Sequence, residues 1–142
     1  MRHQTSKRSK RSKGSALLET ALIFMVFAGM LIGIFDFGQF LFVHQALVER
    51  ARSAARWGAI HEPTNPTAIQ NMVLYNQPTS NASPTYFSLT PDMVQVSSPG
   101  SGTDNYRVVV LITNYPYAVL SPYISGTYYG PNITVSVPLG LN

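Results

Sequence analysis

The architecture of this chain follows from residues 13–43, which read KGSALLETALIFMVFAGMLIGIFDFGQFLFV. Sixteen consecutive residues from Thr20 to Phe35 carry no charge, and the apolar stretch resumes after Asp36 and runs to Val43. A helix rises about 1.5 Å per residue, and roughly 20 apolar residues cross the hydrocarbon core of a bilayer. Residues 17–40 are therefore predicted to span a membrane as one helix.

The basic residues lie on one side of this stretch. Six of the ten Lys and Arg residues fall within the first 13 positions, and the first acidic residue is Glu19. The positive-inside rule then places the N-terminus in the cytoplasm and the C-terminus across the cytoplasmic (inner) membrane. Beyond residue 14 the chain has four arginines and six carboxylates, a net charge of −2. The basicity thus belongs to the leader, which lacks the motifs of a nucleic-acid reader, and no nucleic-acid partner is expected.

The apolar stretch allows two other interpretations. A cleaved secretory signal peptide would place Val26 and Ala28 before its cut, but the apolar residues continue for some fifteen positions beyond that point. A buried helix of a soluble protein would not explain the basic, polar leader. A retained anchor fits both features better.

The helix is predicted to continue beyond the membrane as an amphipathic stalk. Apolar or small residues recur at spacings of three or four at Phe40, Val43, Leu47, Ala51, Ala54 and Gly58. Gly58 and then Pro63 are the expected stop signals. A helix over residues 15–60 would be near 70 Å long, so its outer half needs a soluble domain against its apolar stripe.

Residues 61–142 are predicted to form that domain, a small extracytoplasmic α+β head. Asn65-Pro66 reads as an N-cap and first-turn proline of a short helix ending near Tyr75, followed by a loop to Pro91. Strands are expected around Val94 and Val96, over residues 106–115 and over residues 133–137. The fold class is thus α+β: a long N-terminal helix carrying a small antiparallel sheet.

Tyrosines cluster between the last two predicted strands. They occupy positions 115, 117, 123, 128 and 129, among prolines and glycines that break the chain. Tyrosine is well suited to binding surfaces. The favoured interpretation, however, is that these rings cover a sheet whose core is thin.

Nothing in the sequence predicts an enzyme. Nucleophile elbow, phosphate loop and metal-ligand spacing are all missing, and His44 and His61 stand alone. There is also no cysteine for a thiolate site. No catalytic residue, metal or cofactor is therefore expected.

Two carboxylates interrupt the predicted span. A charge near the bilayer centre costs on the order of 3 kcal/mol on insertion scales, so such residues tend to be partnered or functional. Asp36 lies about 25 Å along the helix from Glu19, close to the opposite interface. It is a candidate membrane-interface polar site, and the favoured expectation is that water solvates it there. Glu19 lies near the cytoplasmic face of the membrane and follows Gly14 at an offset of five residues.

That offset resembles the processing site of type IV prepilins. The residues are Gly14, Ser15, Ala16, Leu17, Leu18 and Glu19, between a basic leader and an apolar helix. In prepilins a membrane peptidase cuts after the glycine, and a glutamate stands fifth in the mature chain. The resemblance implies a leader of residues 1–14, a cut between Gly14 and Ser15, and Glu19 in the fifth position.

Three longer stretches resemble the TadE-like family, pseudopilins or minor pilins of the Flp/Tad pilus machinery. They are residues 16–22, residues 36–39 and residues 51–59. The resemblance is clear from Gly14 to Ala59; beyond that, the short helix and terminal strands match in type rather than in motif. One departure is Thr20, where the family often carries an aromatic or aliphatic residue. The expected partners are membrane lipid, a prepilin peptidase, other pilin-like subunits and the pilus assembly machinery.

The physical role of the glutamate can be argued from charge. Cleavage would create an α-amino group at Ser15, and Glu19 of one subunit could neutralise that amine on a neighbour in a helix bundle. Gly29 and Gly33 form a Gly-x-x-x-Gly pair that lets helices approach closely, although glycine is also ordinary in transmembrane helices. The predicted function is that of a processed pilin-like subunit, in the membrane or in an extracellular pilus, for attachment, adhesion or secretion. The alternative is a non-assembling single-pass anchor that displays a small binding head.

Overall fold

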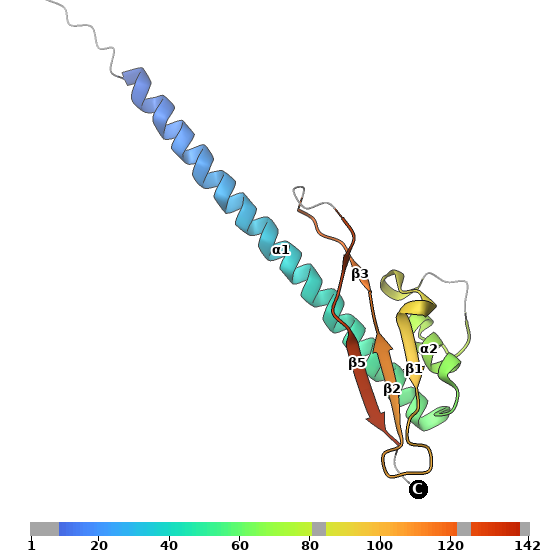
Figure 1. Cartoon of the computed structure of the whole chain (residues 1–142). Coiled ribbons are helices and arrows are strands. Elements are labelled where there is room, and N and C mark those ends of the chain that lie inside the picture. Colours follow the sequence, from blue (N-terminus) through green and yellow to red (C-terminus); the bar gives the residue numbers. More distant parts are fainter. Residues whose placement is uncertain (1–8, 81–84, 122–125, 140–142) are drawn as a thin grey trace, which may run out of the picture.

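One long helix organises the molecule. The computed structural model describes residues 9–80, 85–121 and 126–139. Helix α1 runs from Ser9 to His61, 53 residues and hence about 80 Å. The head packs against its C-terminal part, while the N-terminal half projects away from it (Figure 1). This confirms the predicted α+β class with a long apolar N-terminal helix and a small antiparallel sheet.

Both ends of α1 differ from the expected 15–60. The helix begins inside the leader at Ser9, because nothing in residues 9–14 interrupts it apart from one tolerated glycine at Gly14. It ends at His61, where Pro63 follows and the Glu62 N–H still donates to the Gly58 carbonyl at 3.1 Å. Gly58 is therefore not a stop signal. A Cβ there would overlap the side chain of Ile69, so glycine lets α2 pack closely on α1.

The predicted stripe on α1 carries the core. Five buried residues on this helix share one face, at spacings of one, three or four positions, and the sheet and α2 close over them: Val43, Leu47, Ala51, Ala54 and Ala55. Small alanines at the lower end allow the head to approach the helix backbone. The head thus buries one face of α1 from Val43 onward, whereas most apolar side chains nearer the N-terminus of α1 stay exposed.

Helix α2, Pro66–Tyr75, forms as its capping residues predict. The Asn65 side chain accepts from the Ala68 N–H at 3.1 Å, Pro66 is in the first turn, and Asn76 closes the helix in the left-handed conformation. The expected loop that follows contains two short 3₁₀ helices, η1 (Tyr86–Ser88) and η2 (Pro91–Met93).

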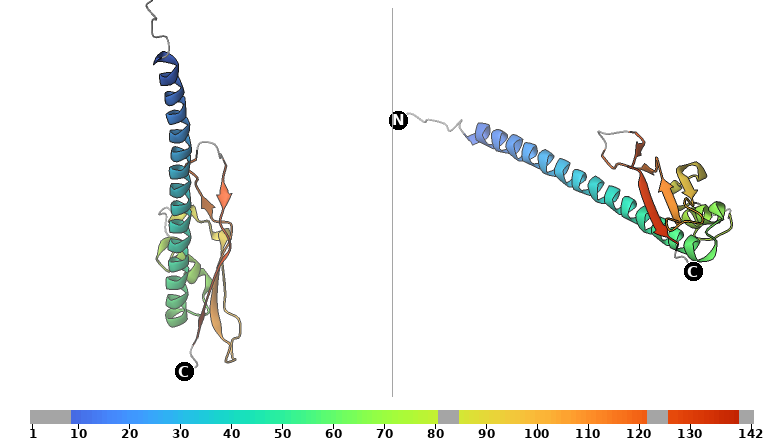
Figure 2. Two further views of the ribbon diagram at one scale, coloured as in Figure 1. Left: turned by 90° about the vertical axis from the view of Figure 1, so that its left-hand side faces the viewer. Right: turned by 60° about the horizontal axis from the view of Figure 1, so that its bottom comes forward.

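Three strands form an antiparallel sheet in the order β1-β2-β5, with bounds Val94–Ser97, Arg107–Ile112 and Ile133–Pro138. Its register pairs Val94 with Ile112 and Ile112 with Ile133, which brings buried side chains of all three strands onto the face toward α1. The two views of Figure 2 show this sheet lying along the lower part of α1. The Gln70 amide donates to the carbonyls of Pro91 and Val94, and so ties α2 to the start of β1.

The strand predicted over residues 106–115 is shorter than expected. β2 ends at Ile112, because Asn114 adopts a left-handed φ of 53°, which turns the chain out of the extended conformation. The chain then enters a second, two-stranded sheet of β3 (Pro116–Tyr117) and β4 (Tyr128–Tyr129). In Figures 1 and 2 this part of the head extends along α1 toward its N-terminal half.

Candidate functional site

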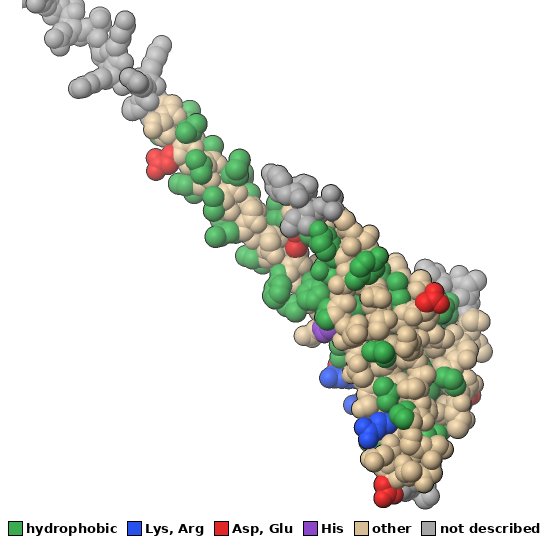
Figure 3. Space-filling model, viewed as in Figure 1, with side chains coloured by type: hydrophobic (Ala, Val, Ile, Leu, Met, Phe, Trp, Pro, Cys, Tyr) green, Lys and Arg blue, Asp and Glu red, His purple; other side chains and the backbone are tan. Residues whose placement is uncertain are grey.

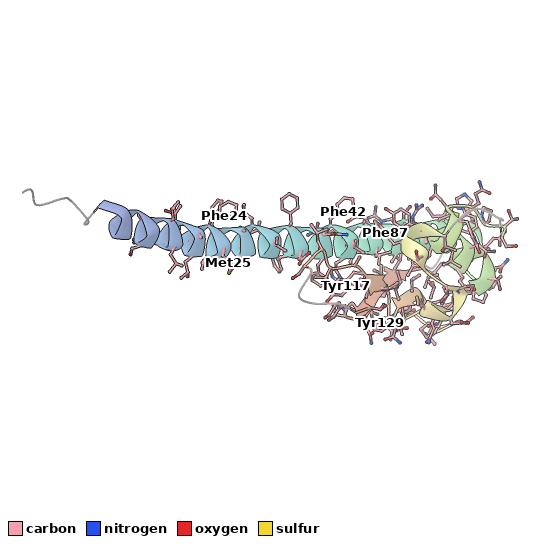
Figure 4. The ribbon with its side chains drawn as sticks, turned by 90° about the horizontal axis from the view of Figure 1, so that it is seen from above. Phe24, Met25, Phe42, Phe87, Tyr117 and Tyr129 are labelled. Carbon is pink, nitrogen blue, oxygen red and sulfur yellow. The ribbon has the colours of Figure 1, made fainter. Side chains whose placement is uncertain are left out.

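The candidate site is the part of α1 that the head leaves uncovered. Large apolar side chains from Leu17 to Phe37 are exposed within the chain, among them Phe24 at 69% and Met25 at 71%. These two side chains point to opposite sides of α1 (Figure 4), so the helix is apolar around its circumference. Figure 3 shows apolar side chains along this half, whereas the Lys and Arg side chains that it colours lie further along, beside the head.

An apolar surface of this kind requires a non-aqueous environment. Helix α1 is long and apolar enough to cross a membrane, its most apolar 18-residue window has a mean hydropathy of 2.3, and no residue of that window is buried in the chain. A core helix of a soluble protein would be covered by its own domain. The uncovered surface therefore argues against that alternative and supports a membrane-anchored protein.

The predicted processing residues lie at the far end of this surface. Gly14 and Ser15 are exposed within α1, and a Cβ on Gly14 would meet no atom within 4 Å. The Thr20 hydroxyl donates to the Ala16 carbonyl at 2.8 Å, which leaves the turn around Glu19 regular. Access to the bond between Gly14 and Ser15 is thus open, although the bond lies in helical backbone.

Among residues 14–80, 85–121 and 126–139, whose side chains the structure describes, Glu19 forms no ion pair. The carboxylate is exposed, and the one ion pair among these residues is between Arg52 and Glu49, at 2.9 Å. The Gly29 and Gly33 pair is similarly open, because a Cβ on either glycine would meet nothing within 4 Å. Within the described residues neither feature is used in packing or pairing, which leaves both accessible to another molecule.

Asp36 differs from its expected state. The two carboxylate oxygens accept from backbone N–H groups of the head, Oδ1 from Leu120 at 2.6 Å and Oδ2 from Ser121 at 3.2 Å. The expectation that water alone would solvate this carboxylate is therefore wrong. A carboxylate accepting two N–H groups is a strong, charge-assisted arrangement. Sequence reasoning missed it, because the partners are 84 and 85 residues away and contribute only backbone atoms.

A second contact between α1 and the head lies one to two turns further along. Tyr115 is fully buried, and its hydroxyl is 2.7 Å from Nδ1 of His44. Gly130 makes room for it, since a Cβ at that position would overlap the Tyr115 ring. Burial, and secondarily the neighbouring Tyr117, raise the pKa of Tyr115 above its ordinary value of 10.0.

Other tyrosines complete this contact. Tyr117 packs on Phe40 of α1 with ring centroids 5.0 Å apart and on Tyr128 at 5.9 Å. Tyr129 is 60% exposed, and Tyr123 lies outside the described residues. The favoured interpretation of the cluster is thus correct for Tyr115 and Tyr117, whose rings fill the space between the head and α1.

The fold and its uncovered helix define a class: a membrane-anchored protein with a pilin-like stalk and head. The sequence model of the family described as TadE-like protein matches residues 14–56. These residues include the uncovered part of α1 and most of the part that packs against the head. The resemblance is therefore confirmed over the helix, and this family consists of structural, Flp/Tad pilus-associated membrane proteins. Searches of curated proteins and of solved structures find no match to the chain.

Proposed function

We propose that this chain is a prepilin-peptidase substrate that acts as a minor pilin or pseudopilin in the assembly of a Flp/Tad-type pilus. The observation that carries the proposal is the uncovered half of α1, an apolar surface bearing an exposed carboxylate, Glu19, which forms no ion pair among the residues whose side chains the structure describes. The positive leader orients it, with the N-terminus in the cytoplasm and the head outside.

Processing after Gly14 would create a positive charge that can pair with Glu19. It removes the six basic residues of the leader and creates an α-amino group at Ser15, one helical turn from Glu19. Glycine costs a helix roughly 1 kcal/mol relative to alanine, so α1 opens most easily where the peptidase must reach the backbone. The leader is then a disposable topology signal.

Assembly would place Glu19 of one subunit beside the amine of its neighbour. An unpaired charge in an apolar bundle costs several kcal/mol, so only the register that pairs them is stable. Gly29 and Gly33 present backbone without side chains to a second helix, which allows the close approach that a bundle needs. These features support partners that are pilin-like subunits and membrane lipid.

Mass spectrometry of the membrane-extracted protein tests the processing step. The proposal requires an N-terminus at Ser15 in cells that contain the peptidase, and an intact precursor for Gly14→Ala. Gly38→Ala is the matched control, because Gly38 is another helical glycine with nothing within 4 Å of its Cβ position, and it should be processed normally. An intact leader in the wild-type protein would instead support the non-assembling anchor that displays its head.

A second experiment tests assembly separately from processing. Glu19→Ala should be cut normally yet lose co-purification with other pilus subunits and lose piliation. Glu49→Ala is the control, since it removes only an exposed ion pair with Arg52, and such pairs contribute less than about 1 kcal/mol. Normal piliation in the Glu19 variant would refute the register role.

A further inference from the structure

The end of the head nearest the uncovered helix has a feature that neither processing nor assembly explains. Residues 118–121, here called the tip, follow β3 and lie against α1 where Asp36 accepts the N–H groups of Leu120 and Ser121. Two hydrogen bonds from adjacent amides to one carboxylate hold the tip at a defined height on the helix. The tip is therefore positioned by α1 itself.

That height coincides with the edge of the bilayer. From Leu17 to Asp36 the helix advances about 28 Å, and the hydrocarbon core of a membrane is about 30 Å thick. If α1 enters the core near Leu17, Asp36 and the tip beside it lie where the acyl chains meet the headgroups. A carboxylate satisfied by two N–H groups tolerates that boundary better than a bare one.

The chemistry of the tip suits this location. Its residues are Ala118, Val119, Leu120 and Ser121, and no Asp, Glu, Lys, Arg or His occurs anywhere from residue 108 to the end of the chain. Leu120 is 66% exposed, although its own N–H is engaged. On α1 beside it, Phe35 and Phe37 are also exposed. An uncharged apolar surface can enter the boundary region at low free-energy cost, because no charged group has to be stripped of water.

Aromatic side chains complete the arrangement on the side away from the membrane core. Tyr117 packs on Phe40, and Phe42 is 6.2 Å from Phe87 of the head, centroid to centroid. Figure 4 shows Phe42 and Phe87 close together at the end of the head that faces the uncovered helix. Tyrosine is enriched at the headgroup level of membrane proteins, where its apolar ring and polar hydroxyl are both accommodated, and Tyr117 is the residue of this group that has both.

We propose that the tip is a membrane-contact site, with Leu120 inserted among the lipid headgroups beside the outer end of the span. The occupant is lipid rather than a second protein, because the tip continues the lipid-facing surface of α1 at the same height and offers no charge for a protein partner to recognise. The head then contacts the bilayer at two places, α1 and the tip, which restricts its tilt. This inference requires anchoring in a membrane, but neither cleavage nor pilus assembly.

The absence of cysteine makes the test direct. Full-length Leu120→Cys, labelled with a nitroxide and reconstituted into phosphatidylcholine–phosphatidylglycerol vesicles, is compared with labelled Ser101→Cys. Ser101 is exposed in the turn between β1 and β2, and this turn lies at the opposite end of the head (Figure 1). The measurement is the ratio of collision rates with oxygen, which concentrates in lipid, and with a water-soluble nickel chelate.

We expect a ratio several-fold higher at position 120 than at position 101. Equal ratios, both typical of water, would overturn the proposal. Low collision rates with both reagents at position 120 would also overturn it, because they would mean that protein covers the tip. A ratio that rises only when other pilus subunits are co-reconstituted would assign the surface to them and refute the lipid contact.

A second variant tests the same contact without the nitroxide label, which could itself change the position of the tip. Leu120→Trp adds one indole to a chain whose sole native tryptophan, Trp57, lies about 30 Å further along α1 than Asp36. Lipids brominated near the headgroup should quench the new tryptophan, whereas Trp57 in the parent protein should remain unquenched. Equal quenching of parent and variant would refute the proposal.

Discussion

Replacing Asp36 by asparagine tests how the head is held to the helix. The carboxylate accepts from the Leu120 and Ser121 N–H groups at 2.6 and 3.2 Å. Asparagine retains one acceptor oxygen and presents a donor NH₂ in place of the other, so one amide loses its partner and faces another donor. The shape of the side chain is otherwise unchanged.

The expected magnitude follows from these two bonds. A hydrogen bond to a charged group contributes about 1.5–3 kcal/mol, and partial exposure of Asp36 places this pair toward the lower end. We expect the free energy that opens the tip to fall by about 1–3 kcal/mol. Amide hydrogen exchange at residues 120 and 121 should then accelerate by about fivefold to a hundredfold.

The assay is residue-resolved hydrogen exchange on the full chain in detergent micelles or lipid nanodiscs. Glu19→Gln is the matched control, because it neutralises the other carboxylate of the same apolar helix, which is exposed and far from the tip, and should leave exchange at the tip unchanged. Unchanged exchange at residues 120 and 121 in the Asp36 variant would refute the reasoning. Acceleration spread over β1, β2 and β5 would also contradict it, because the effect must stay local.

Three further predictions concern the packing of the head. The raised pKa of Tyr115 means that the unfolded chain loses its phenol proton first, so stability should decline as pH rises above about 10; Tyr115→Phe should flatten this decline in urea titrations at pH 9 to 11. Gly130→Ala should destabilise the head by about 1–3 kcal/mol or more, because its Cβ overlaps the Tyr115 ring, whereas Gly38→Ala should be neutral or slightly stabilising; equal midpoints of thermal unfolding would contradict this. Asn65→Ala should cost about 1 kcal/mol through loss of the α2 cap, measured by chemical denaturation, and no change would mean that the cap contributes nothing.

Much of the architecture was readable from local patterns. The 3.6-residue period of apolar positions predicts the stripe at Val43, Leu47, Ala51 and Ala54, all of which are buried in the structure. The capping of α2 by Asn65 was equally local, since donor and acceptor lie within one turn. The spacing of Gly14 and Glu19 can also be read from the sequence alone, and both residues lie within the stretch that the TadE-like family model matches, residues 14–56.

Other features could not be read from neighbouring residues. Gly58 signals a helix end by its local preference, yet in the structure it admits Ile69 of α2 against α1, and packing outweighs the roughly 1 kcal/mol that glycine costs a helix. Similarly, β2 ends early because Asn114 adopts a left-handed φ of 53° in the folded chain.

The sequence by itself determined the anchor, the direction of its charges, the stalk and the class of the head, because each depends on composition or on a period within one element. Only the tertiary structure decided what Asp36 and Tyr115 do. Asp36 accepts the backbone N–H groups of Leu120 and Ser121. Tyr115 contacts His44 and fills the space that Gly130 leaves open. Backbone amides and empty space have no side-chain signature, so contacts across more than seventy residues become visible only when the chain is folded.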